Sequence, residues 1–300
     1  MTNFICKACG TQFTESSVPP EACPVCADDR QFVGWKGQEW TSAEALGLIH
    51  RTALRLEAEG LHGIGIEPKF AIGQRALLLR SSTGNVLWDC VNLIDESAVE
   101  EVTALGGLSA IAISHPHYYS SMIDWSRAFG GVPIYLHEGD RQWVMRPGPE
   151  IVFWEGETKG IGPGLTLVRC GGHFEGGTVL HWAEGEGALL TGDIVQVVPD
   201  RRFVSFMFSY PNYIPLNAAK VNRIAKSLEP FAFERMFGAW WKQNVMTDAK
   251  VALHRSVERY LRAIERSSLA RGRGAVSPGS PGPELRSCQG SERPAAWPLR

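Results

Sequence analysis

The sequence has no long apolar segment and no strong excess of charge of either sign. No run approaches the roughly 18 apolar residues that cross a membrane, and the first residues, MTNFICKACG, lack the apolar core of a signal peptide. The 30 lysines and arginines nearly balance the 32 aspartates and glutamates, so the net charge of −2 gives no general attraction to nucleic acid. We therefore expect a cytoplasmic protein that binds neither membranes nor nucleic acids.

Three common functional motifs are also missing. The chain contains no G-x-G-x-x-G, no Walker A and no G-x-S-x-G segment. The first two hold nucleotide phosphates on glycine-rich turns, and the third presents a serine nucleophile. Nucleotide-phosphate binding and serine hydrolysis therefore have no support. The 44% hydrophobic content of the 300 residues is that of an ordinary globular protein, long enough for one large domain and a small one.

The cysteines are concentrated at the N-terminus. Seven are present, and four of them form two C-x2-C pairs separated by thirteen residues: Cys6, Cys9, Cys23 and Cys26. The odd total and the missing export signal argue against a disulfide framework. Reactive dithiols are the alternative, but these normally accompany a βαβ pattern that is absent here. Four thiolates at this spacing predict a closed tetrahedral metal site, occupied by zinc or by iron.

Residues 1–36 resemble the rubredoxin-like zinc ribbons, through the segments CKACG and CPVC. Zinc in such a closed site would have a structural role, whereas iron would make the ribbon an electron-transfer module.

The rest of the chain divides into three parts. We interpret residues 37–66 as a linker containing a helix from Thr41 to Glu59, because Thr41 and Glu44 form a capping box and Gly60 follows the last turn. Residues 67–266 alternate strand-like and helix-like segments, which is typical of a layered α/β domain. Residues 267–300 are rich in glycine, proline, serine and arginine and predict a disordered tail.

Within the α/β domain the apolar runs and capping residues predict a hairpin, further strands and four helices. The expected strands are Ala71–Arg80, Asn85–Asn92, Leu108–Ser114, Pro133–Leu136, Leu165–Arg169, Thr178–Trp182 and Ala188–Leu190. The expected helices begin near Ser97, with its capping partner Glu100, and span Tyr119–Phe129, Leu216–Leu228 and Asp248–Glu265.

Three histidines and an aspartate follow predicted strands. The buried strand LSAIAIS runs into His115-Pro116-His117, His173 lies in CGGHFEGG, and Asp193 ends the segment LLTGD. Residues at the carboxyl ends of neighbouring strands converge at one edge of a sheet, and imidazole with carboxylate is a common ligand set for zinc or iron. The sequence therefore predicts a metal site formed by His115, His117, His173 and Asp193.

These motifs, in this order and spacing, resemble those of the metallo-β-lactamase-fold superfamily of metallohydrolases over about 200 residues. The resemblance implies a four-layer αββα sandwich preceded by the four-cysteine ribbon. It also implies a structural acidic role for Asp89, which ends the strand NVLWD, and a metal-bridging position for Asp193.

The chain departs from the superfamily at the second metal. The usual first motif is His-x-His-x-Asp-His, but Tyr119 and Ser120 stand in place of its last two ligands. The final histidine is also missing, because the segment FGAWW offers only Trp240 or Trp241 there. All three private ligands of the second metal are absent together, so we expect a mononuclear site holding one zinc or iron ion.

This ligand set favours a metal-dependent hydrolase of a small ester, thioester or lactone, because a metal-bound water with a pKa near ~7 is a nucleophile at neutral pH. Asp193, Tyr119 and Ser120 are the candidate catalytic residues, the last two either as hydrogen-bond donors to an oxyanion or as fillers of the vacated space. One alternative is a mononuclear iron oxidoreductase resembling the persulfide dioxygenases, with ligands His115, His173 and Asp193. Another is a non-catalytic member that kept the fold.

Two further features lie near this site in the sequence. The aromatic segment PDRRFVSFMFSYPNYIP follows Asp193 and predicts a substrate-pocket wall, a cover for the sheet or a homodimer surface. His137 and Asp140 follow a strand and belong either to the rim of the site or to an ordinary surface loop. We expect a small-molecule substrate as the partner.

Overall fold

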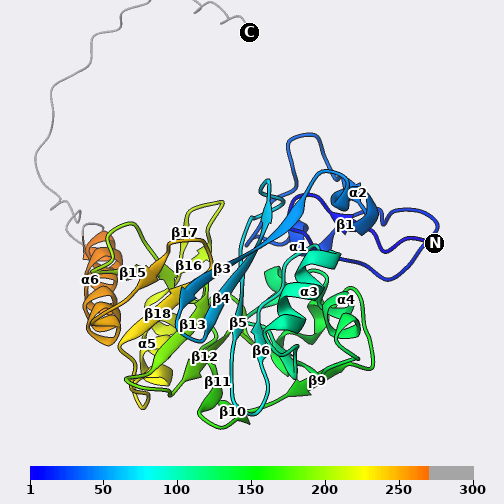
Figure 1. Ribbon diagram of the computed structural model, residues 1–300. Helices are drawn as coiled ribbons and strands as arrows, with labels where there is room; N and C mark the ends of the chain where they lie inside the picture. The colour runs from blue at the N-terminus through cyan, green and yellow to red at the C-terminus, as the bar shows by residue number, and fades with distance from the viewer. Residues whose placement is uncertain (270–300) are drawn as a thin grey trace, which may run out of the picture.

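The computed structural model describes residues 1–269, and Figure 1 shows two sheets stacked between outer helices, with the N-terminal segment lying across one end. The predicted α/β sandwich with an N-terminal ribbon is confirmed. The last helix continues to Leu269, so residues 267–269 of the predicted tail are helical. The remainder of that tail lies outside the described residues.

The first sheet has seven strands in sequence order. Strands β3 to β6 are antiparallel, whereas β6 to β9 run parallel and are connected by helices. Their bounds are β3 Arg51–Ala58, β4 Leu61–Glu67, β5 Ala76–Leu79, β6 Val86–Trp88, β7 Ala110–Ala112, β8 Ile134–His137 and β9 Ile151–Trp154.

The predicted linker helix from Thr41 to Glu59 is wrong. Only the five-residue helix α2, Ala43–Gly47, forms there, and its N-terminus is capped by Ser42, whose side chain accepts a hydrogen bond from the Ala45 N–H. The following residues form β3, which pairs along its length with β4. Gly60, with a φ of 73°, belongs to the tight turn between these two strands and does not end a helix. Pairing of β3 with β4 outweighs the capping-box pattern on which the helix prediction rested, and residues 51–67 therefore belong to the α/β domain.

The second sheet has six strands in the order β10-β11-β12-β13-β18-β19, with β13 and β18 parallel and the other pairs antiparallel. Two short hairpins, β14–β15 and β16–β17, follow β13. The bounds are β10 Thr158–Gly162, β11 Leu165–Arg169, β12 Thr178–Trp182, β13 Ala188–Gly192, β14 Gln196–Val197, β15 Val204–Ser205, β16 Met207–Ser209, β17 Ile214–Pro215, β18 Arg235–Gly238 and β19 Asn244–Val245.

The helices differ from the sequence predictions mainly at their first residues. Asp95, and not Ser97, caps the helix α3 by accepting a hydrogen bond from the Ala98 N–H. The helix predicted from Tyr119 begins only at Met122, and a short 3-10 helix, Pro116–Tyr118, precedes it. The bounds are α3 Glu96–Ala104, α4 Met122–Ala128, α5 Ala218–Leu228 and α6 Ala249–Leu269, with 3-10 helices at Pro116–Tyr118 and Glu138–Trp143.

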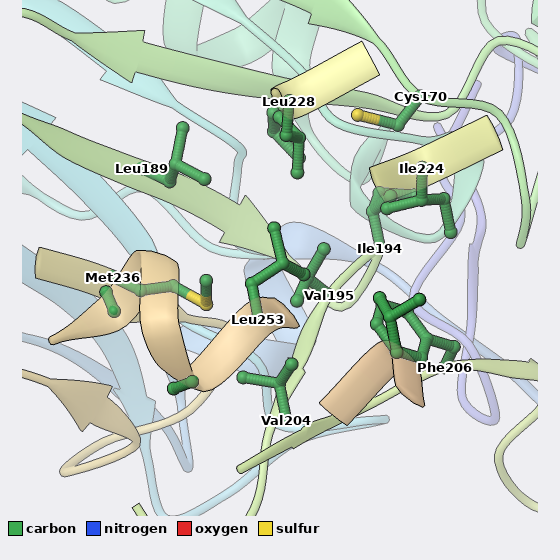
Figure 2. Close-up of a cluster of buried hydrophobic side chains, with 14 of the residues drawn as sticks. Cys170, Leu189, Ile194, Val195, Val204, Phe206, Ile224, Leu228, Met236 and Leu253 are labelled. Carbon is green, nitrogen blue, oxygen red and sulfur yellow. The ribbon is translucent and has the colours of Figure 1, made fainter. Parts of the chain in front are cut away.

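Three buried clusters account for the four layers. Alternate residues of the strands meet between the two sheets, as Leu77 and Leu79 meet Leu180 and Leu190. The opposite face of the first sheet packs against α3 and α4, and that of the second sheet against α5 and α6. Figure 2 shows the latter cluster, in which Leu228 of α5 and other apolar side chains of strands and helices point toward one another. The many apolar side chains buried in these three clusters stabilise the folded domain.

The ribbon packs directly on the α/β domain. Its strand β1, Ile5–Cys6, pairs with β2, Trp40–Thr41. The short helix α1, Pro24–Ala27, begins directly after Cys23 and contains Cys26. Gln12 donates a hydrogen bond to Asp124 of α4 at 2.8 Å, and Asn92 donates one to the Gly10 carbonyl at 2.7 Å. These contacts place the ribbon beside the carboxyl ends of the first-sheet strands. Across residues 1–269, no helix combines the length and apolar character needed to span a membrane.

Candidate metal centres

The four N-terminal cysteines converge as their spacing predicts. Their sulfur atoms all lie within 4.8 Å of one another, and all four side chains are buried. The Sγ atoms of Cys6 and Cys26 are 3.5 Å apart, and those of Cys9 and Cys23 are 3.7 Å apart. The Gln38 amide donates a hydrogen bond to the sulfur of Cys6, at 3.2 Å. The closed arrangement of four thiols is consistent with a bound metal.

The second cluster lies at the carboxyl ends of strands from both sheets. His115 and His117 follow β7, His173 follows β11, and Asp193 follows β13. One ligand atom from each residue lies within 4.8 Å of the others, and all four residues are buried. Nε2 of His115 is 3.0 Å from Oδ1 of Asp193, and Nε2 of His173 is 3.2 Å from Nδ1 of His117. The sequence motifs therefore predicted which residues come together.

Two glycines make these positions possible. Gly192, next to Asp193, has a φ of 53°, and a Cβ at this position would lie 2.6 Å from Oγ of Ser114. Gly172, next to His173, has a φ of 86°, and its Cβ would lie 2.8 Å from Cδ1 of Ile224. Any larger residue would be strained at both positions. The glycines in LLTGD and CGGH thus bring the ligands close to the neighbouring strands and helix.

Hydrogen bonds to the outer ring nitrogens orient two of the imidazoles. Nδ1 of His115 lies 2.9 Å from Oγ of Ser114, whose hydroxyl donates to Asp89 at 2.7 Å, and we assign the Nδ1 proton on that basis. Nδ1 of His173 lies 2.8 Å from the Phe208 carbonyl, which only accepts hydrogen bonds. Both rings therefore keep the lone pair of Nε2 for the centre of the cluster. Asp89 is thus connected to the His115 ring through one serine hydroxyl.

The cluster has the donor set of a cation site. Nε2 of His115 and Oδ1 of Asp193 are buried and have no hydrogen-bond partner. Burial lowers the pKa of His173 to about 3 and holds those of His115 and His117 well below their usual range, so all three imidazoles are neutral at pH 7. Burial also raises the pKa of Asp193 to about 7. A cation would satisfy these lone pairs and stabilise the ionised carboxylate. The residues therefore fit a bound metal.

A cavity of 240 Å³ opens onto this cluster. His117 and Asp193 line it, together with Tyr210, Trp240 and Lys69. The ribbon forms another wall through four residues, Ala8, Arg30, Gln31 and Phe32. A larger cavity of 740 Å³ lies where β6 and β11 begin, away from both clusters, and includes none of their ligating residues. The smaller cavity is therefore the candidate substrate site.

Part of the predicted aromatic segment reaches the cavity. Tyr210 lines it and donates a hydrogen bond from its hydroxyl to the Asp193 carbonyl at 2.6 Å. Phe206 instead lies in the core against α6, and Tyr213 is exposed. The segment thus contributes both to the cavity wall and to the core.

The residues that replace the second-metal ligands have other partners. Tyr119 is buried in the core cluster beneath α4, and Ser120, with a φ of 35°, accepts a hydrogen bond from Asn92. Neither is among the described residues that line the cavity, and these contacts favour a space-filling role. Their proposed action as donors to an oxyanion stays a prediction. Trp240 lines the cavity, whereas Trp241 packs against the glycines of β4.

His137 and Asp140 hold a neighbouring loop and do not join the cluster. Nε2 of His137 lies 3.1 Å from the Gly156 carbonyl, and Asp140 accepts a hydrogen bond from the Gly176 N–H at 2.9 Å. Asp140 is thereby connected to the loop between β11 and β12, which contains His173. Burial raises the pKa of Asp140 to about 7.

Known proteins match this chain in fold and in sequence. The solved structure of the DIM-1 metallo-β-lactamase exposed to ceftazidime aligns with a TM-score of 0.54 and 13% identity, over 71% of this chain and 98% of that one. The FIM-1 enzyme from Pseudomonas aeruginosa in the mono-zinc form aligns with a TM-score of 0.51 and 12% identity, over 73% and 96%. The search for a matching protein family model found none.

The stacked sheets, outer helices and His/Asp cluster define a protein of the metallo-β-lactamase fold, here with an N-terminal four-cysteine ribbon. The sequence is 47% identical over 270 residues to the uncharacterized protein YmaE of Bacillus subtilis (strain 168). The alignment covers 88% of this chain and 97% of that protein. The chain therefore belongs to the YmaE family.

Proposed function

We propose that the protein is a hydrolase that uses a single metal ion, held by the His/Asp cluster, to cleave a small ester, thioester or lactone. The observation that carries the proposal is the convergence of three buried neutral imidazoles and one buried carboxylate on one point. Among the described residues, no further histidine, cysteine, aspartate or glutamate joins this group. One metal, and not two, is the occupancy that this ligand set supports.

A metal at this position would supply Lewis acidity and activate a water nucleophile. His115, His117 and His173 would bind it as neutral donors, and Asp193 would complete the set. The Ser114–Asp89 pair keeps the His115 ring in its orientation, and the Phe208 carbonyl does the same for His173. Phe174 contacts all three imidazoles, with ring centroids 5.0 to 5.6 Å apart, and excludes bulk water from that side.

Tyr210 acts as a positioning residue in this proposal. Its hydroxyl donates to the backbone carbonyl of Asp193, and burial raises its pKa well above the usual range, so the proton that makes this bond is retained. The contact fixes the backbone of Asp193 beside the cavity. A substrate whose electrophilic carbon reaches the cluster would lie between Tyr210 and Trp240, which both line the cavity.

We propose zinc at both clusters. A mono-zinc form is recorded for the FIM-1 enzyme, whose fold is similar to this one. Iron is the second candidate, because His115, His173 and Asp193 also form the two-histidine, one-carboxylate set of iron oxygenases. The position of the ribbon favours this alternative, since Ala8, between two cysteines of the ribbon, lines the same cavity as His117. An iron-loaded ribbon would lie beside the cluster as an electron donor.

Metal analysis and substrate assays separate these functions. Zinc in the purified chain, with hydrolysis of small thioesters that His173→Ala abolishes, supports the proposal. Iron at the His/Asp cluster with oxygen consumption selects the oxidoreductase. A metal that is lost with Cys6→Ser and unaffected by His115→Ala, without activity, selects a non-catalytic protein.

A further inference from the structure

Arg30 of the ribbon lies in the cavity of the α/β domain and has an incompletely satisfied guanidinium. Its Cζ is 4.4 Å from the ring centroid of Phe174 and 5.1 Å from that of Phe208. Nη1 pairs with Asp28 at 2.9 Å, whereas Nε is buried and has no hydrogen-bond partner. A buried donor without a partner is costly. The side chain is therefore fixed by aromatic packing and keeps its Nε donor for another acceptor.

A second arginine in the chain shows what the same local sequence does elsewhere. Both arginines follow an aspartate by two residues and donate their backbone N–H to it, Arg30 to Asp28 and Arg202 to Asp200. Arg202 is exposed, and its Nε and Nη2 both donate hydrogen bonds to Asp200, at 2.9 and 2.8 Å. Arg30 uses only Nη1 in this way. The turn alone does not explain the free Nε of Arg30.

The backbone around Arg30 is held in place by the α/β domain. Ser209 donates a hydrogen bond to the Arg30 carbonyl at 3.1 Å, and Asn212 donates to the carbonyls of Asp29 and Gln31, each at 3.1 Å. Both donors belong to the β16–β17 hairpin region that follows Asp193. These three hydrogen bonds fix the backbone of residues 29–31 against the α/β domain, where Arg30 lines the cavity.

The charges around the cavity favour an anion. Arg30 and Lys69 both line it, and the stem of Lys69 packs over Gly73, whose Cβ would lie 2.4 Å from Cε of the lysine. Asp193 is the only carboxylate among the described lining residues, and it belongs to the metal ligand set. Phe174, which Arg30 covers, also contacts the three imidazoles. The guanidinium therefore lies next to the candidate reaction centre.

From this geometry we propose that Arg30 is a specificity-determining residue, which binds an anionic oxygen group of the substrate, a carboxylate or a phosphate, with Lys69 in support. The proposal rests on the proposed function, because it places the anionic group of that same substrate. It makes the ribbon part of the substrate site. A planar guanidinium with a free N–H suits an oxyanion through charge-assisted hydrogen bonds.

Calorimetric titration of the full-length, metal-loaded protein tests the anion site without requiring turnover. The probes are succinate, inorganic phosphate and the neutral succinamide. We expect succinate or phosphate to bind at least 10-fold more tightly than succinamide. Arg30→Gln should weaken binding of that anion by about 10-fold to 100-fold, the range of a lost charge-assisted hydrogen bond. Succinate and phosphate distinguish the two kinds of anionic group.

Arg202→Gln is the matched control, since it removes the same turn contact outside the cavity, and it should bind like the wild type. Arg30→Lys keeps the positive charge without the planar donors, and its affinity for the anion should lie between those of the wild type and Arg30→Gln. If Arg30→Gln loses the metal of the ribbon, the comparison of Arg30→Lys with the wild type tests the proposal instead. Equal affinity of the wild type and Arg30→Gln for both anions, or equal binding of succinamide, would overturn the proposal.

Steady-state hydrolysis of two thioesters separates this inference from the proposed function. One is a succinyl thioester with a free carboxylate, and the other carries a neutral amide in place of that carboxylate. We expect Arg30→Gln to raise KM for the succinyl substrate alone. If the wild type cleaves neither substrate but shows Arg30-dependent anion binding, the hydrolase proposal fails and the anion site stands. If it cleaves both equally well, and Arg30→Gln changes neither, the anion site fails.

Discussion

Oγ of Ser114 lies 2.9 Å from Nδ1 of His115, directly behind the face that this imidazole turns toward the cluster. The hydroxyl in turn donates to Asp89 at 2.7 Å, and the Ser114 backbone N–H donates to the same oxygen. A buried carboxylate therefore acts on the histidine through one serine. A hydrogen bond to the outer nitrogen of a metal-binding histidine determines both the orientation and the basicity of that ring.

Removing this contact should weaken the metal site without unfolding the protein. We expect Ser114→Ala to raise the dissociation constant of the metal at the His/Asp cluster about 10-fold or more, the usual effect of losing an outer hydrogen bond to a ligand. Titration against a chelator of known affinity measures this change. Ser126→Ala is the control, because Ser126 is equally buried but donates to the Val132 carbonyl. Equal metal affinity in the two variants would show that Ser114 only fills space.

The ribbon should depend on its metal for folding. Cys23→Ser leaves three thiols in the N-terminal cluster, and the binding energy of such a site is its folding energy. We expect residues 1–36 to lose their protection from hydrogen exchange while the sheets of the α/β domain keep theirs, because that domain has its own large core. Loss of protection throughout both sheets would contradict this expectation.

Asp140 should make stability depend on pH. Burial raises the pKa of its carboxyl from 3.8 to about 7. The folded state therefore binds more protons than the unfolded state between about pH 4 and 7, and stability falls as pH rises through that window. Asp140→Asn keeps an oxygen for the Gly176 N–H but cannot ionise. We expect the stability of Asp140→Asn to fall less steeply with rising pH, and its Tm at pH 7.5 to exceed that of the wild type.

Thermal unfolding of both proteins, stripped of metal, at pH 5, 6, 7 and 7.5 measures this difference. The two Tm curves should approach each other toward pH 5, where the wild-type carboxyl is protonated as well. Parallel curves over the whole range would mean that Asp140 titrates normally in the folded protein.

Local motifs predicted both clusters well. The cysteines form two C-x2-C pairs, and each ligand of the His/Asp cluster follows a strand in a recognisable segment such as LLTGD. The same reasoning failed between Thr41 and Glu59, where Leu46, Ile49 and Leu56 have helical spacing but Ile49 and Leu56 are exposed and residues 51–58 form β3. Only pairing with β4, a long-range contact, determines that structure. Arg30 was missed for a related reason. Its Asp-x-Arg turn is the same as that of the exposed Arg202, and only docking of the ribbon places it in the cavity.

The number of metal ions in the α/β domain tests the central claim most directly. Mass-spectrometric metal analysis of the wild type, Cys23→Ser and His173→Ala should give two ions per chain in the wild type and about one in each variant, because each substitution damages one cluster. Restoring ligands with Tyr119→Asp and Ser120→His should add at most a weakly held third ion, since Trp240 still lines the cavity in place of the final histidine. Two ions within the α/β domain of the wild type, or none, would contradict the mononuclear centre.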